Sequence, residues 1–205
     1  MSKKERAART REALIHSAAS VFGQRGYVET TLGMISSGAG VSAGALHFHF
    51  ENKASLAAAV EASAADSLRA TVRAVYAARG SALHALTESS HALARTLADD
   101  AVARAGVRLG HEAVYVTARN LPEQWYAYVR RLLAEAAQEG ALLPGLCLRH
   151  AAAMVVAATI GFEVLARDDP KWLSARTLNG FWRVVLPALG TPEALRRLAL
   201  RGPGP

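Results

Sequence analysis

The sequence predicts an all-helical (all-α) protein. Half of its 205 residues are apolar, which is enough for a hydrophobic core, whereas only 6% are aromatic. Apolar residues recur at helical spacing over long segments, and prolines are rare inside these segments. Alternating runs of β-branched residues, which are typical of strands, do not occur between the turn signals.

The N-terminal segment begins with a basic stretch that runs into an amphipathic helix. Residues 2–11 hold five basic residues and one acidic residue. An apolar stripe that includes Ile15 and Phe22 predicts a helix over about 6–25. We expect this stripe to pack on the segment that follows it.

Residues 31–53 have the pattern of two short helices joined by a glycine turn. Leu32 and Ile35 fall at helical spacing, Gly38 and Gly40 bracket a stop, and Ser42 can cap the second helix. The apolar face expected for the second helix consists of Val41, Ala45 and Phe48. Such a short helix buries little surface, so we expect it to present its exposed side chains to the major groove of DNA, as in a helix-turn-helix. A plain helical hairpin is the alternative.

The charge of the chain agrees with a polyanionic partner. The net charge is +7 and the isoelectric point is near 10.1. Charge alone does not separate nucleic acid from an anionic membrane. Residues 2–11 are expected to form either an arm along DNA phosphates or a solvated, frayed terminus.

Several other classes of protein lack support in the sequence. The lone Cys147 excludes an intrachain disulfide and fits a reducing cytoplasm, where we expect the protein. The longest apolar run, 151–162, is too short to span a bilayer. His47 and His49 are two residues apart and point in different directions on a helix, so no metal site is expected. The sequence contains neither a nucleophile elbow nor a phosphate-binding loop, so we expect the protein to be no enzyme and to need no cofactor.

The rest of the chain is a series of helical patterns. Asn52 is expected to cap a long helix that ends near Gly80. Further helices are predicted at about 81–98, 100–116, 122–139, 148–167, 170–186 and 192–200. We therefore expect a DNA-binding domain over 1–52, a ligand-binding and dimerisation domain over 53–200, and a disordered tail over 201–205.

One apolar segment predicts a homodimer. Residues 151–160, AAAMVVAATI, are apolar on every side, which indicates a helix buried on more than one face. A four-helix bundle made by two subunits would bury it, and a two-fold molecule would also suit a palindromic DNA site. An internal core helix of one subunit is the alternative. The small residues expected at the helix contacts are Ala153, Ala157 and Gly161.

These motifs resemble the TetR family of bacterial transcriptional repressors over the whole length of the chain. EALIHSAASVFGQRGYVETTL followed by GAGVSAGALHFHFENKASL is similar to the family pattern. That pattern is an aliphatic-alanine helix, F-x-x-x-G-Y-x-x-T-T, and then G-V-s-x-G-x-l-Y-x-H-F-x-x-K-x-x-L. The forms ALHFHF and AGVRLGHEA, the latter followed by a proline and Trp125, resemble the γ-butyrolactone autoregulator receptors of actinomycetes.

The resemblance implies a set of DNA-binding residues. Where receptors of this subgroup commonly carry a lysine that reaches guanine, this chain has Ala43, which can only touch a thymine methyl group. Where the family usually has tyrosine, it has His47, which would bind phosphate more strongly when protonated. Packing or capping is the alternative for His47 and His49. The positions implied near phosphates are Thr31, His47, His49 and Lys53, and those implied at the groove are Ser42, Ala43 and Gly44.

The resemblance also implies that Trp125 lines or covers an effector pocket. An indole supplies a flat apolar wall and one hydrogen-bond donor, which suits a small lactone or furan with a hydrophobic tail. Ordinary core packing is the alternative for each other residue. The residues expected to complete the chamber are Val107, Leu109, Met154, Val155, Thr159 and Phe162. Further polar groups are offered by His84, His91 and His111.

We therefore expect a ligand-responsive repressor. It would bind a palindromic double-stranded DNA operator as a homodimer and be released by a small hydrophobic effector such as a γ-butyrolactone or furan. One alternative is a TetR-type repressor that responds to antibiotic-like, multidrug or fatty acyl ligands. From a different class, the alternative is a helical architectural protein that coats DNA through its charge.

Overall fold

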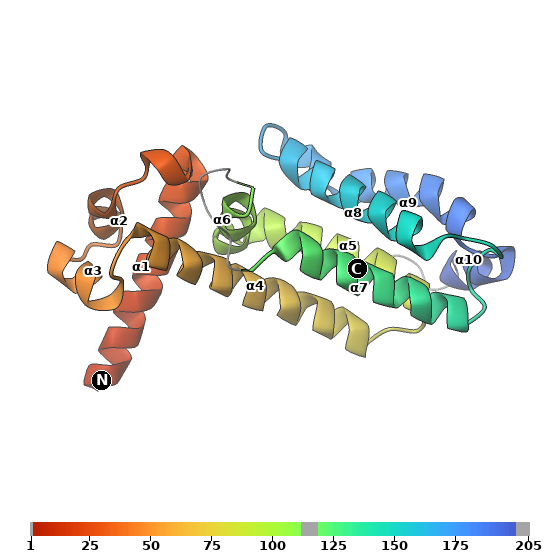
Figure 1. Ribbon diagram of the computed structural model, residues 1–205, viewed down its shortest axis with the longest axis horizontal. Coiled ribbons are helices and arrows are strands. Elements are labelled where there is room, and N and C mark those ends of the chain that lie inside the picture. The colour runs from red at the N-terminus through yellow and green to blue at the C-terminus, as the bar shows by residue number, and fades with distance from the viewer. Residues whose placement is uncertain (1, 112–118, 200–205) are drawn as a thin grey trace. The chain divides into compact units, whose positions relative to one another are not determined.

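The computed structural model describes residues 2–111 and 119–199. The regular elements in these residues are helices, and the prediction of an all-helical fold is confirmed (Figure 1). An isolated antiparallel bridge joins Leu142 to Gly190. The described residues fall into two compact units, of which the first takes 2–68, 99–111 and 119–121, and the second takes 69–98 and 122–199.

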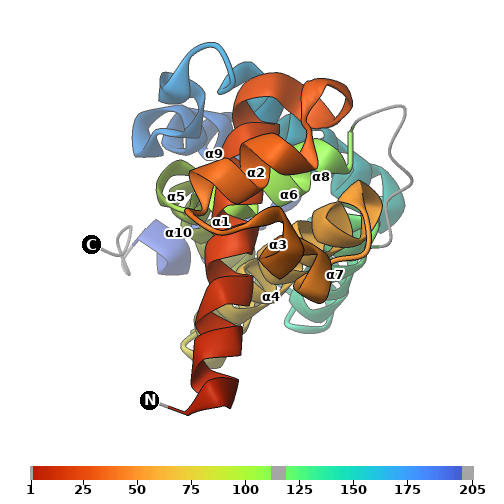
Figure 2. The same ribbon diagram turned by 90° about the vertical axis from the view of Figure 1, so that its left-hand side faces the viewer.

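The first unit is built around its N-terminal helix, α1 (Lys3–Glu29). Helices α2 (Leu32–Gly38) and α3 (Ala43–His49) lie against α1, and Figure 2 faces this end of the chain. The expectation that the apolar stripe of the first helix packs on the two short helices is confirmed. The buried core that joins them includes Leu14, Ile15, Ala18 and Phe22 of α1, Ile35 of α2 and Leu46 of α3.

Helix α1 begins earlier than predicted because Ser2 and Glu5 form a capping box. The Ser2 hydroxyl accepts from the Glu5 amide at 3.2 Å, and the Glu5 carboxylate accepts from the Ser2 amide at 2.8 Å. The basic residues from Lys3 onward are therefore helical and do not form a free arm. Near its other end α1 kinks at Gly26, whose φ of 76° lies in the left-handed region that favours glycine.

Residues 53–68 of α4 and the whole of α6 complete the first unit, and α4 continues into the second unit. Helix α4 (Lys53–Ala77) is capped as predicted by Asn52, whose side-chain oxygen accepts from the Ser55 amide at 2.8 Å. Helix α6 (Ala101–Leu109) packs on α1, so the compact unit reaches beyond the boundary expected at residue 52. The helix predicted over 100–116 ends at Leu109, and residues 112–118 lie outside the described part of the chain.

The second unit holds α5 (Ala82–Asp99), α7 (Leu121–Gln138), α8 (Leu148–Leu165), the 3-10 helix η1 (Pro170–Leu173), α9 (Ala175–Leu189) and α10 (Pro192–Ala199). The helix predicted over 170–186 is broken at Ser174, whose backbone is extended and whose hydroxyl caps α9 by accepting from Thr177. The expected disordered tail, 201–205, lies outside the described residues. The core of this unit includes Leu86, Val129, Leu132, Leu133, Val155 and Trp182.

Candidate DNA-binding and effector sites

The N-terminal end of α3 is held firmly and faces solvent. The Ser42 hydroxyl caps α3 by accepting from the Ala45 amide at 3.2 Å, and Gly40 makes the preceding turn with a φ of 65°. Leu46, which is only 1% exposed, anchors the helix to the core. The predicted groove-facing residues Ser42, Ala43 and Gly44 and the predicted phosphate-binding residue His47 are all exposed.

The buried face of α3 differs from the one predicted. Phe48 was expected in the apolar face but is 81% exposed, whereas Leu46 and Phe50 are buried. Leu46 and Phe50 are four residues apart and so share one side of the helical path, while Phe48 lies on the other side. The guanidinium of Arg11 lies over the Phe50 ring at 5.3 Å, and the Phe48 ring meets His49 edge to face. The i, i+4 pair of Leu46 and Phe50 was the sequence signal for the correct face.

The ammonium group of Lys53 has three partners inside the protein. Its Nζ donates to the carbonyl oxygens of Tyr27 at 2.9 Å, Val28 at 3.2 Å and Thr30 at 3.0 Å, and lies 4.6 Å from the centre of the Tyr27 ring. A lysine has three donors, so all of them are engaged. Lys53 therefore ties the end of α1 to the start of α4, and a direct bond to a phosphate would have to replace one of these bonds.

The remaining two phosphate-binding candidates, Thr31 and His49, differ in how accessible their side chains are to an outside partner. The Thr31 hydroxyl caps α2 by accepting from the Met34 amide at 3.3 Å. Thr31 is exposed, and its hydroxyl hydrogen is still available for an outside acceptor. His49 is half-buried beside Phe48. Thr31 is therefore better placed than His49 to donate a hydrogen bond to a phosphate.

Two of the predicted effector-binding residues meet in the second unit. The Trp125 indole nitrogen on α7 donates to the Thr159 hydroxyl on α8 at 2.8 Å, and Thr159 donates in turn to the Val155 carbonyl oxygen at 2.9 Å. The Trp125 ring stacks on Tyr128 at a centre-to-centre distance of 5.7 Å. Trp125 and Thr159 are both half-buried, so their hydrogen bond lies among largely apolar side chains.

Tyr128 is a polar group beside Trp125 that the sequence did not single out. Its hydroxyl lies 3.0 Å from the Ser89 hydroxyl on α5. Burial raises the pKa of the Tyr128 phenol above its ordinary value, so this group is a neutral hydrogen-bonding partner at neutral pH. The stacked pair of Trp125 and Tyr128 follows from their i, i+3 spacing on α7.

The other predicted effector-binding residues do not lie together, because some belong to the first unit and some to the second. Leu109 is 1% exposed in the core of the first unit, and Val107 is half-buried on the same helix. Val155 is fully buried in the core of the second unit. Met154 is 42% exposed on the outer side of α8, and Phe162 packs its ring against Trp172 and Phe181. Met154 therefore lies at the surface of the single chain, and its predicted place in an effector chamber stays a prediction.

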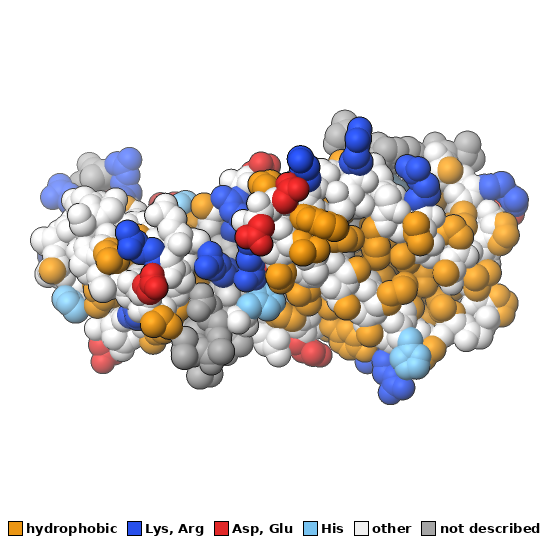
Figure 3. Space-filling view, turned by 90° about the horizontal axis from the view of Figure 1, so that it is seen from above, with side chains coloured by type: hydrophobic (Ala, Val, Ile, Leu, Met, Phe, Trp, Pro, Cys, Tyr) orange, Lys and Arg blue, Asp and Glu red, His pale blue; other side chains and the backbone are white. Residues whose placement is uncertain are grey.

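An apolar surface, which we call the α8/α9 face, covers the outer side of these two helices (Figure 3). Helix α8 also carries small exposed residues, Ala153 and Ala157. Helix α8 is long and apolar enough to cross a membrane by length and composition, yet only 28% of it is buried in the single chain. The large exposed residues of the face are Met154, Val164 and Leu165 of α8 and Val184 of α9.

Both halves of the chain match a known protein family. Residues 14–60 match the family described as bacterial regulatory proteins, tetR family. Residues 80–191 match the family described as tetracyclin repressor-like, C-terminal domain. The chain belongs to the TetR family. It is therefore a transcriptional regulator and not an enzyme, and α8 is part of the C-terminal domain of such a regulator.

Relatives of this TetR-family chain extend over nearly its full length. The A-factor receptor protein of Streptomyces griseus is 29% identical over 98% of this chain and 71% of the relative. A crystal structure of a γ-butyrolactone receptor, described as ArpA-like, has a TM-score of 0.82 with 29% identity and covers 96% of this chain and 97% of that one. CprB from Streptomyces coelicolor, solved with its biological operator sequence, has a TM-score of 0.78 with 28% identity, covering 95% and 96%.

Proposed function

We propose that this TetR-family regulator is a homodimeric repressor that binds a palindromic operator and is released by a small hydrophobic effector, such as a γ-butyrolactone. The observation that carries the proposal is the exposed, capped N-terminal end of α3. It is joined in the same chain to a C-terminal domain similar to those of γ-butyrolactone receptors. The cytoplasmic location expected from the sequence is part of this proposal.

The DNA-reading step rests on α3. Ser42, Ala43 and Gly44 form the exposed start of the helix, where side chains reach base edges in the major groove. Ala43 offers only a methyl group and Gly44 has no side chain. This surface therefore recognises thymine methyl groups and the shape of the DNA more than the hydrogen-bonding groups of the base edges. Thr31 and His47 supply contacts to phosphates, and Lys53 holds the end of α1 against the start of α4.

The dimer rests on the α8/α9 face. Val184 is 77% exposed, and a contiguous apolar surface of this kind marks an interface in a protein that functions in water. The small side chains of Ala153 and Ala157 allow a second pair of helices to approach closely, which gives a four-helix bundle. The two copies of α3 would then enter successive major grooves about 34 Å apart.

The effector step rests on the bonded pair of Trp125 and Thr159. A lactone or furan carries both an apolar ring and hydrogen-bonding oxygens, so it can pack on the indole and compete for the Thr159 hydroxyl. Effector binding that favours a second dimer shape opposes operator binding by the same coupling free energy. A tenfold loss of operator affinity requires only about 1.4 kcal/mol of coupling.

Footprinting on the DNA upstream of the coding region tests the proposal. The expected result is protection of a palindrome, salt-sensitive affinity, and release by a synthetic γ-butyrolactone at a concentration that raises the melting temperature of the protein. Uniform weak protection of all sequences would defeat the DNA-reading step. Release only by antibiotic-like or fatty acyl compounds in the same assay would favour the alternative effectors.

A further inference from the structure

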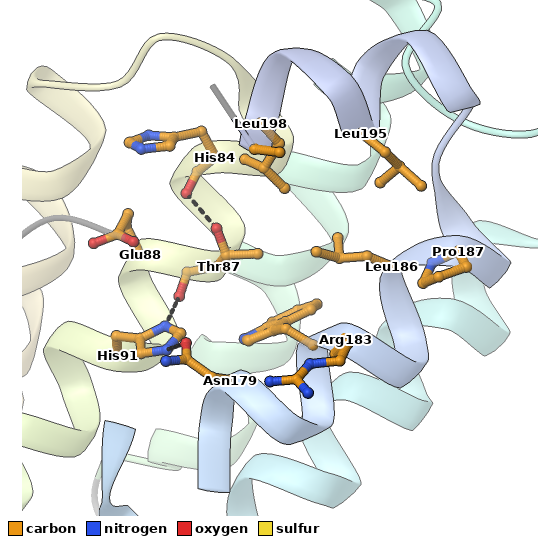
Figure 4. A pocket seen from close by; sticks show the side chains of 12 residues that line it. His84, Thr87, Glu88, His91, Asn179, Arg183, Leu186, Pro187, Leu195 and Leu198 are labelled. Carbon is orange, nitrogen blue, oxygen red and sulfur yellow. Dashed lines mark hydrogen bonds between the residues drawn. The ribbon is translucent and has the colours of Figure 1, made fainter. Parts of the chain in front are cut away.

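We infer that the second unit holds an additional small-molecule site, between α5, α9 and α10, which takes a neutral, hydroxyl-bearing amphiphile. A pocket of about 480 Å³ opens there (Figure 4). This volume lies within the range of small-molecule sites and holds about sixteen non-hydrogen atoms at the packing of liquid water. Trp125 and Thr159 do not line the pocket, and the inference does not depend on DNA binding or on the proposed effector site.

The two sides of this pocket have different chemistry. Along α5, His84, Glu88 and His91 present polar side chains, as Figure 4 shows. Leu186 of α9 and Leu198 of α10 lie across from them. A ligand that fills the pocket must therefore carry an apolar body on one side and a polar group on the other.

The two histidines of the pocket differ in a way that indicates a missing partner. His91 is only 8% exposed and both of its ring nitrogens have partners inside the protein, because Nδ1 donates to the Thr87 carbonyl oxygen at 2.9 Å and Nε2 lies 2.8 Å from the Asn179 side-chain oxygen. The Nδ1 atom of His84, in contrast, is buried and has no hydrogen-bond partner in the described part of the chain. A buried imidazole nitrogen without a partner is unfavourable, and a turn of the His84 ring toward a ligand hydroxyl in the pocket would satisfy it.

The charges around the pocket favour a neutral ligand. Glu88 and Arg183 both line it, and neither has an ion-pair or hydrogen-bond partner among the described residues. One carboxylate and one guanidinium leave this pair without a net charge, so a charged ligand would gain no net attraction from it in return for its lost hydration. A hydroxyl group can donate to Glu88 or His84 and accept from Arg183, and it needs no counter-charge.

Calorimetric titration of the full chain with 4-hexylresorcinol, a neutral diol with an alkyl chain, tests the inference. The expected result is saturable binding at one site per chain, retained in Trp125→Ala. 4-Hexylbenzoate and 4-hexylbenzylammonium, which carry opposite charges on a similar body, should each bind about tenfold more weakly. Saturable binding that disappears in Trp125→Ala, or equal affinity for the three compounds, would overturn the inference.

Two variants and one control locate the bound diol. His84→Leu removes the unpartnered nitrogen and should weaken binding about fivefold, the effect of one hydrogen bond. Leu198→Arg fills the apolar side and should abolish binding. His150→Leu changes an exposed histidine on α8, outside the pocket, and should leave binding unchanged. Circular dichroism melts verify that each variant folds, and unaltered affinity in both pocket variants would contradict the assignment.

Discussion

The indole nitrogen of Trp125 lies 2.8 Å from the hydroxyl oxygen of Thr159, and this hydrogen bond joins α7 to α8 across 34 positions of sequence. The hydroxyl passes its own hydrogen on to the backbone of α8 at Val155. A compound that inserts between the two helices has to break or replace this link. In the proposed function, an effector at the Trp125 indole would therefore act on the contact between α7 and α8.

Thr159→Val tests whether this link belongs to the effector response. Valine keeps the shape of threonine and removes the only acceptor that the structure shows for the Trp125 indole, which costs about 1–3 kcal/mol when the donor stays buried. We expect operator affinity to be retained and the γ-butyrolactone concentration for half-maximal release to change about tenfold in gel-shift titrations. Thr177→Val, which removes a hydroxyl bonded to the Lys171 carbonyl, is the control. Identical release curves for both variants would show that the link plays no part.

Lys53→Met separates a positioning role from a phosphate contact. Its three bonds to the end of α1 would be lost, so we expect the free energy of unfolding to fall by about 2 kcal/mol in urea denaturation. Because the ammonium is already engaged, the slope of log affinity against log salt should stay the same. A slope smaller by about one would instead indicate a lost phosphate contact. Lys171→Met, an exposed lysine of the second unit, is the control.

Phe48→Ala should impair DNA binding without affecting stability. Its ring is 81% exposed next to His47, so we expect the free energy of unfolding to change by less than about 0.5 kcal/mol. Operator affinity should fall about fivefold, since an exposed ring on the outward side of α3 makes apolar contacts with the DNA. Leu46→Ala is the matched control in the same helix and should destabilise the protein by about 2–5 kcal/mol. Unchanged operator affinity for Phe48→Ala would place the ring outside the interface.

Val184→Asp tests the proposed dimer. A carboxylate in the middle of an apolar interface loses its hydration without a partner, so we expect the variant to sediment as a monomer. Operator affinity should fall at least about a hundredfold, because the two half-sites would be bound separately. Val28→Asp provides the matched control, since Val28 is also a large exposed apolar residue, at 65%, but lies on α1. A wild-type protein that sediments as a monomer would contradict the dimer directly.

Helix positions and the helix-turn-helix followed from local sequence signals. Asn52, Ser42 and the glycine turn are short-range features, and the structure places each of them as caps and a turn. Helix α1 starts earlier than predicted because Ser2 and Glu5 form a capping box, whose spacing is visible in the sequence. The break at Ser174 has the same origin, since a serine before a helical run is a cap signal.

The contacts of single side chains were much less predictable. Nothing local to Lys53 shows that three carbonyl groups, more than twenty positions earlier, converge on it. Met154 and Val155 are neighbours in one apolar run, yet one faces solvent and the other is fully buried, because only the packing of α8 decides which side is covered. The meeting of Trp125 with Thr159 depends on tertiary structure in the same way.

The close contact between α6 and α4 leads to a last prediction, which concerns the stability of the first unit. A Cβ atom built at Gly106 would lie 2.3 Å from the Ala64 Cβ and 3.3 Å from the Val60 carbonyl oxygen. Gly106→Ala should therefore push the two helices apart and lower the free energy of unfolding by about 1–3 kcal/mol. Gly23→Ala, whose Cβ would meet nothing within 4 Å in the same unit, should leave stability unchanged or raise it slightly.

Double-mutant analysis decides whether close packing is the cause. Ala64→Gly removes the methyl group that the new Cβ would strike, so the combined variant Gly106→Ala with Ala64→Gly should recover part of the lost stability. Additive losses would show that the clash with Ala64 is not responsible, and the contact with the Val60 backbone would then be the remaining obstacle. Because α6 also packs on α1, which carries the core beneath α3, the same variants should change operator affinity in parallel with stability.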